Sequence, residues 1–123
     1  MSDFLQLGKR GEALAWNFLR KQGYSILEKN YRTRLGEVDV VAKKQGVLIF
    51  FEVKTRRDQR FGLPLEAVDW KKRQKLARVA ETYVQSKGLE NRAARFDILS
   101  VTWDGTGEPQ FSLLEDAFSV EEA

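Results

Sequence analysis

Val47-Leu-Ile-Phe-Phe-Glu-Val-Lys-Thr-Arg-Arg57 is the stretch of sequence that decides the fold. Its first five residues are apolar, and such an unbroken run rich in β-branched and aromatic residues predicts a strand buried on both faces of a sheet. Glu52 and Lys54 follow and share one face, because side chains alternate along a strand. Removing charge from water is costly. Two interpretations therefore stay open: an ion pair at the sheet margin, or a metal ligand beside a catalytic lysine.

The composition limits the chemistry that the chain can perform. Its 123 residues, 42% hydrophobic and 32% charged, predict one domain spanning 1–123. There is no cysteine and no histidine. Catalysis would therefore rest on carboxylates, Lys, Arg, Tyr or hydroxyl groups, and any metal would be a hard, oxygen-seeking ion. With no disulfide, no signal-peptide pattern and no membrane-length apolar run, we expect a cytoplasmic protein that does not enter the membrane.

Charge is distributed unevenly along the chain. Residues 54–78 hold nine Lys/Arg against three Asp/Glu, whereas residues 104–123 hold six Asp/Glu and no Lys/Arg. A basic region beside the central strand indicates a polyanionic partner. A solvated helix face is the simpler explanation for many charge runs.

Hydrophobic periodicity predicts the order of helices and strands. An α-β-β-β-α-β order with a small β addition indicates a mixed sheet with helices on its faces, an α/β fold. We expect the acidic tail to fray from about residue 115. The expected helices are 3–22 and 65–87, and the expected strands are 24–34, 37–43, 47–54, 95–103 and 110–114.

Asp39 lies on the strand before the central one. A hairpin centred near Gln45 pairs position 39 with about position 51, so Asp39 and Glu52 are predicted neighbours. Adjacent carboxylates repel unless a cation neutralises them, and Mg²⁺ suits one or two carboxylates with water and substrate oxygens. Lys54 could then orient water or stabilise charge on a phosphate. Alternation also predicts that Val38, Val40 and Ala42 share the face opposite Asp39.

Three further charged residues need an interpretation. Glu12 borders the apolar stripe of the first helix, where an exposed position is the simpler interpretation. Lys72 lies on the stripe of the second helix, where it either snorkels to solvent or aims its ammonium at the site. Asp97 follows Phe96 in a predicted strand, and we expect it to be structural, accepting bonds from a neighbouring Arg or a backbone amide.

Taken together, several short motifs resemble known families. Asp39 followed by Glu52-Val53-Lys54 resembles the D…(D/E)-x-K pattern of the PD-(D/E)XK nuclease superfamily, although Val38 stands where that pattern has Pro. Nearly the whole chain is similar to the YraN-like bacterial proteins. The shared motifs are Gly8-Lys9-Arg10-Gly11-Glu12, Gly23-Tyr24, Asn30-Tyr31-Arg32, Gly36-Glu37-Val38-Asp39, Phe51-Glu52-Val53-Lys54-Thr55-Arg56, Phe61-Gly62-x-Pro64 and Arg95-Phe96-Asp97.

The resemblance implies a restriction endonuclease-like αβββαβ core and a role for each site residue. It implies that Asp39 and Glu52 bind Mg²⁺ or Mn²⁺ together with the Val53 carbonyl, that Lys54 is the catalytic lysine, and that Glu12 is the acid brought by the first helix. Resolvase-like members of the superfamily act as dimers, so a homodimer is a further expectation.

Three functions are compatible with these observations. The first is a metal-dependent nuclease that hydrolyses phosphodiester bonds in nucleic acid, with structure-selective cleavage of DNA favoured and RNA left open. The second is a catalytically silent nucleic-acid-binding module of the same fold, and the third is an interaction protein that docks through residues 104–123. In the first two, the nucleic-acid backbone would be held by Arg32, Arg34, Arg56, Arg57 and Lys72.

Overall fold

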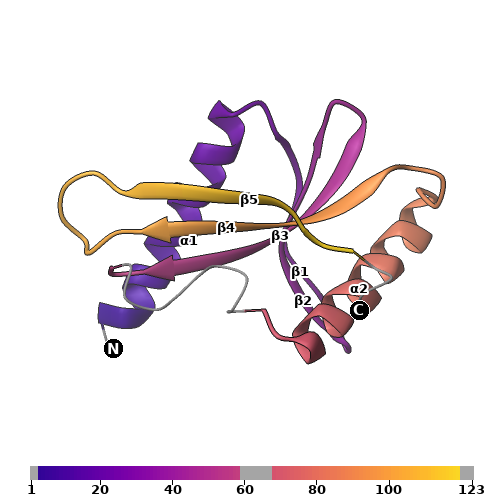
Figure 1. Cartoon of the computed structure of the whole chain (residues 1–123), viewed down its shortest axis with the longest axis horizontal. Coiled ribbons are helices and arrows are strands. Elements are labelled where there is room, and N and C mark those ends of the chain that lie inside the picture. Colours follow the sequence, from indigo (N-terminus) through magenta and orange to yellow (C-terminus); the bar gives the residue numbers. More distant parts are fainter. Residues whose placement is uncertain (1–2, 59–67, 120–123) are drawn as a thin grey trace.

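The computed structural model describes residues 3–58 and 68–119, with seven helices and strands among them (Figure 1). Their order repeats the predicted αβββαβ sequence and then adds one strand. No helix within these residues is long and apolar enough to cross a membrane. The elements are α1 Asp3–Lys21, β1 Ser25–Thr33, β2 Gly36–Lys44, β3 Val47–Arg56, α2 Trp70–Lys87, β4 Ala94–Thr102 and β5 Gln110–Phe118.

The strands form one mixed sheet in the order β1-β2-β3-β4-β5. β1, β2 and β3 make the predicted antiparallel meander, and β5 also pairs antiparallel with β4. β3 and β4 are parallel, because helix α2 carries the chain back between them. The predicted mixed α/β arrangement is therefore confirmed, with β3 in the middle of the sheet.

The helices cover opposite faces of the sheet, so the core has two apolar layers. One layer joins α2 to Leu48, Phe50, Phe96 and Ile98. The other joins α1 to Ile49, Phe51, Leu99 and Val101. β3 and β4 contribute alternate residues to both layers, as expected of strands buried on both faces.

Two element boundaries differ from the sequence prediction. Helix α2 begins at Trp70 because Asp69 caps it, its carboxylate accepting a hydrogen bond of 2.9 Å from the Lys72 amide. Residues 65–67, where we expected the helix to begin, lie outside the described part of the chain. β5 continues past Leu114 to Phe118, whose buried ring stacks on Phe96, so the chain does not fray at residue 115.

The predicted face of Val38 is wrong because the β1–β2 hairpin turns over near Asp39. Val38 packs in the α2 layer, whereas Val40 packs in the α1 layer, although a regular strand would put both on one face. In the same part of the hairpin, Asn30 adopts a left-handed φ of 53°. Asp39 therefore lies at the point where the hairpin changes the face that it presents to the core.

Helix α1 approaches β3 most closely at Gly11. A Cβ atom at this position would meet the Thr55 side chain, with Thr55 Cγ2 only 2.6 Å away. Alanine should therefore destabilise the fold by about 1–2 kcal/mol, because the overlap outweighs its better helix propensity. Urea unfolding of Gly11→Ala measures this cost.

Gly8 provides the matched control, since a Cβ there meets nothing within 4 Å. Gly8→Ala should leave stability unchanged or raise it. Thr55→Ala removes the atoms that clash, so Gly11→Ala should cost less in that background. An equal cost in both backgrounds would show that the contact with Thr55 is not the reason for the glycine.

Candidate active site

The candidate site lies where strands β2 and β3 part. Their pairing ends at Val40 and Phe51, and the next position of that register sets Asp39 opposite Glu52. This is within one residue of the prediction from the hairpin. Beyond that point the Val53 amide donates a 2.7 Å hydrogen bond to Asp39 Oδ2. A side-chain carboxylate thus replaces a backbone carbonyl of β2 as the partner of β3.

Glu52 is the buried centre of the charge cluster. Its side chain is only 8% exposed, and Glu52 Oε1 accepts contacts from Lys72 Nζ at 2.5 Å and Lys54 Nζ at 3.4 Å. Lys72 belongs to the first turn of α2, which the Asp69 cap fixes in place. Of the two interpretations for Lys72, the ammonium aimed at the site is therefore the correct one. The ion pair between Glu52 and Lys54 is also present.

The cluster changes the proton affinities of its members. Burial and the nearby Glu52 charge raise the pKa of Asp39 to about 7. Burial and the adjacent Lys72 lower the pKa of Lys54. Burial opposes the charge of Lys72, but the hydrogen bond with the Glu52 carboxylate and its negative charge outweigh it and raise the Lys72 pKa. Burial at the site therefore disfavours the charged forms of Asp39 and Lys54, whereas contact with Glu52 favours the charged form of Lys72.

Glu12 is not part of a carboxylate cluster in this structure. Its neighbour Gly11 contacts Thr55, which alternates with Lys54 along β3 and so faces the other side of the sheet. Within residues 3–58 and 68–119, no group of three acidic side chains could hold a metal. The expected convergence of Glu12 with Asp39 and Glu52 is thus not seen, and a functional role for Glu12 stays a prediction.

The predicted nucleic-acid-binding arginines are spread over two ends of the sheet. Arg32 is exposed and pairs with Glu37 at 3.1 Å, and exposed Arg34 lies in the β1–β2 turn. Arg56 ends β3, beyond Lys54, and Arg57 follows it. Lys72, the fifth predicted residue, is partly exposed and contacts Glu52 at the candidate site.

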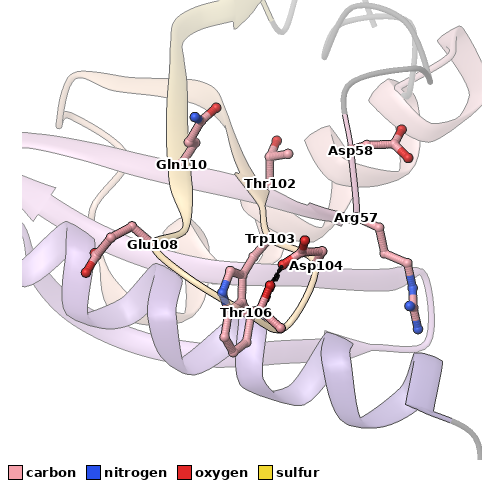
Figure 2. Close-up of a pocket in the computed structure, with 8 residues that line it drawn as sticks. All are labelled: Arg57, Asp58, Thr102, Trp103, Asp104, Thr106, Glu108 and Gln110. Carbon is pink, nitrogen blue, oxygen red and sulfur yellow. Dashed lines mark hydrogen bonds between the residues drawn. The ribbon is translucent and has the colours of Figure 1, made fainter.

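A pocket of about 440 Å³ opens beside Arg57, between the end of β3 and the β4–β5 loop (Figure 2). Figure 2 shows Trp103 and Thr106 on this loop, with Asp104 bonded to Thr106. The lining holds three acids and one arginine, so the charge of the pocket does not favour a phosphate. The lining residues are Arg57, Asp58, Thr102, Trp103, Asp104, Thr106, Glu108 and Gln110.

Asp97 has the structural role that the sequence predicts. It is 1% exposed and accepts hydrogen bonds from Arg95 Nε at 3.0 and 3.2 Å and from the Asp116 amide at 2.9 Å. These bonds tie β4 to the end of β5. The carboxylate of Asp97 is thereby committed to the fold, as expected.

Ser100 lies beside the candidate site, although no feature of the sequence marks it as a site residue. It pairs with Lys54 across the parallel strands and is 5% exposed. Within the described residues its Oγ atom has no hydrogen-bond partner. Its place on the face of Phe96 and Ile98 follows from alternation, but its position beside Lys54 depends on the β3–β4 register, which sequence periodicity does not specify.

The fold and site define a mixed α/β protein with a buried carboxylate–lysine cluster at the fork of its central strands. Residues 11–101 match the model of the "Uncharacterised protein family UPF0102", and the chain belongs to this family. This confirms the expected YraN-like assignment.

Relatives in several bacteria match over most of their length. A UPF0102 protein of Alkaliphilus metalliredigens is 50% identical over 95 residues, covering 77% of this chain and 83% of its own. One from Dictyoglomus thermophilum is 46% identical over 103 residues, covering 84% and 87%. One from Moorella thermoacetica is 48% identical over 97 residues, covering 79% and 81%.

The raised pKa of Asp39 predicts how stability depends on pH in the absence of added metal. An unfolded Asp loses its proton near pH 4, whereas folded Asp39 keeps it until about pH 7. The folded state therefore binds more protons in this window, and its stability falls as the pH rises from about 4 to about 7. Asp39→Asn keeps an acceptor for the Val53 amide but cannot ionise.

We expect Asp39→Asn to be more stable than the wild type at pH 8, by about 2 kcal/mol, with the difference shrinking toward pH 4. Urea midpoints in EDTA at several pH values measure it. Glu90→Gln, which changes an exposed acid that makes no contact with Asp39, is the control and should show no such trend. A pH-independent difference for Asp39→Asn would contradict the expected titration.

The buried hydroxyl of Ser100 predicts an unusual substitution effect. Leaving such a group without a partner costs about 1–3 kcal/mol, so Ser100→Ala should unfold at the same temperature as the wild type or higher. Thermal unfolding measures this. Ser112 pairs with Ser100 on β5 but is exposed, so Ser112→Ala should be neutral. A clear loss of stability for Ser100→Ala would mean that its hydroxyl has a partner in solution.

Proposed function

We propose that this protein is a metal-dependent nuclease that hydrolyses phosphodiester bonds in nucleic acid, with DNA as the expected substrate. The observation that carries the proposal is the meeting of Asp39 and Glu52 at the β2–β3 fork, next to Lys54. The resemblance to the PD-(D/E)XK superfamily, and the αβββαβ order within the chain, support the same conclusion.

The donor atoms at the fork fit Mg²⁺ or Mn²⁺. Glu52 is buried and Asp39 lies half-buried beside it. Burial raises the pKa of Asp39, and the nearby Glu52 charge, which a divalent cation would neutralise, raises it further. In a strand, the amide and carbonyl of one residue face the same neighbouring strand. The Val53 amide faces Asp39, so the Val53 carbonyl is directed toward that fork too and could serve as a third ligand.

When bound, such an ion would activate water and neutralise charge on the phosphate. Lys54 would hold a proton at Nζ beside the reacting phosphate, orient the attacking water and stabilise the developing negative charge. The lowered pKa of Lys54 suits this role, because it brings the ammonium closer to the range in which protons are exchanged. Val53 keeps Asp39 in place through its amide.

Lys72 would act as a removable counter-ion. It bonds to the Glu52 oxygen that also contacts Lys54, so that oxygen is shielded when no ligand is present. A phosphate entering the site offers the Lys72 ammonium a new partner and leaves Glu52 for a cation. Lys72 would thereby couple the binding of nucleic acid to the release of Glu52 as a metal ligand.

The alternative is a catalytically silent nucleic-acid-binding module of the same fold. Glu52 is already neutralised by two lysines, and no third acidic side chain completes a metal cluster among the described residues. Cleavage of branched, flapped, single-stranded and duplex DNAs and RNAs with Mg²⁺ and Mn²⁺ separates the two functions. The silent module would bind but cleave none of them.

Substitution of Asp39 and of Lys54 should abolish cleavage for different reasons. Asp39→Asn removes a negative charge, so the ion should bind at least tenfold more weakly. Lys54→Ala removes a nearby positive charge, so the ion should bind as well or better while turnover falls by at least a hundredfold. Calorimetric titration with Mn²⁺ and a nuclease assay at saturating metal measure both effects.

Arg32→Ala, which removes a charge from the exposed Arg32–Glu37 pair, is the control and should leave ion binding unchanged. If Asp39→Asn and Lys54→Ala lose the ion equally, Lys54 acts as a scaffold for Glu52. If neither affects cleavage, the activity does not belong to this site.

A further inference from the structure

Trp70 is the most exposed large hydrophobic side chain among the described residues, at 59%. It is the first residue of helix α2, directly after the Asp69 cap. Within the described part of the chain, its ring makes no stacking contact, cation–π contact or hydrogen bond. By contrast, Trp16 lies under Lys29 and Trp103 under Arg10, with Trp103 also bonded to the Gly107 carbonyl. Of the three tryptophans, Trp70 is the one whose ring has no such partner among the described residues.

The surface around Trp70 is strongly basic. From Trp70 to Ala80 the helix contains five Lys/Arg and no Asp/Glu. Lys71, Lys75 and Arg78 are exposed, and at spacings of four and three residues they follow one side of the helix. An aromatic face beside a row of cations is complementary to a ligand with flat apolar groups and regularly spaced negative charges.

The position of Trp70 relative to the candidate site limits the class of ligand that could reach both. Lys72, two residues further along the same helical turn, contacts Glu52. A ligand whose phosphate lies at Glu52 and Lys54 therefore passes the start of α2 within a short length. Side chains two residues apart point about 160° away from each other on a helix, so the ligand must bend around the helix end. A flexible single strand can do so more easily than a stacked duplex.

We propose that Trp70 stacks on an unpaired base of a nucleic acid whose backbone lies along Lys71, Lys75 and Arg78. Bases inside a duplex are already stacked on each other, so Trp70 favours single-stranded segments. The inference rests on the proposed function for the nature of the ligand, and it adds the substrate class: strands with unpaired bases close to the phosphate at the site.

Binding in EDTA tests the stacking without requiring cleavage. The probes are a twelve-nucleotide oligothymidine and a duplex hairpin of equal charge, titrated into a Trp16→Phe/Trp103→Phe variant in which Trp70 is the remaining tryptophan. Oligothymidine should quench the fluorescence strongly, and the hairpin should quench it much less. By fluorescence anisotropy of labelled probes, Trp70→Ala should weaken oligothymidine binding by about tenfold and hairpin binding by less than twofold.

Two further variants separate stacking from loss of stability or of apolar surface. Trp70→Phe keeps an aromatic face and should recover most of the affinity for oligothymidine. Leu35→Ala removes another exposed apolar side chain, 45% exposed in the β1–β2 turn, and should change neither affinity. Lys75→Ala should weaken both probes equally, because it contacts the backbone without sensing base pairing.

The outcomes distinguish this inference from the proposed function. Equal losses on both probes with Trp70→Ala, or no quenching by oligothymidine, would overturn the stacking role and leave Trp70 for a protein partner. Intact selectivity in a wild type that cleaves no substrate would refute the nuclease but keep the stacking. Cleavage that does not depend on Trp70 would support the nuclease but refute the stacking role of Trp70.

Discussion

A buried carboxylate at the end of an apolar strand is the constraint on which the rest of this structure depends. Glu52 follows five apolar residues of β3 and is 7% exposed, so its charge needs partners close by. One comes from the same strand, Lys54, and the other from the first turn of α2, Lys72. The ion pair with Lys72 therefore fixes how the crossover helix meets the sheet. The Asp69 cap and the apolar contacts of Leu76 and Val79 complete that orientation.

The fork between β2 and β3 is stabilised by a side chain that is also poorly suited to its surroundings. Asp39 satisfies the Val53 amide, which would otherwise be left without its strand partner. Its carboxylate nevertheless stands near Glu52, and its pKa rises to about 7 because it is buried next to like charge. Strongly shifted pKa values and unfavourable local charge of this kind cluster at functional sites of proteins.

Much of the architecture follows from sequence periodicity, whereas the joining of distant side chains does not. The apolar run of β3, the alternation of β4 and the stripe of α2 predict the mixed sheet, and the hairpin spacing brings Asp39 to Glu52 within one residue. The face of Val38 could not be predicted, because the change near Asn30 depends on one left-handed backbone conformation.

For Lys72 the sequence allows two interpretations, because helical periodicity places it toward the core but does not identify the residues that it contacts there. The position of Ser100 beside Lys54 depends on the β3–β4 register, which periodicity does not specify. Strand β5 is longer than predicted because contacts with Asp97 and Phe96 hold its C-terminal end in the sheet.

The same charges explain how a site of this kind is compatible with folding in the absence of its ligand. The cluster contains two carboxyl groups and two lysine side chains, so their formal charges balance without a metal. Lys72, which is partly exposed, covers Glu52 on the solvent side. A ligand that carries both a divalent cation and a phosphate could exchange partners with each group: the cation with Glu52 and Asp39, the phosphate with Lys54 and Lys72. Neither half alone replaces both sets of contacts. If the proposed function holds, this arrangement would favour the joint binding of a cation and a phosphate over the binding of either one alone.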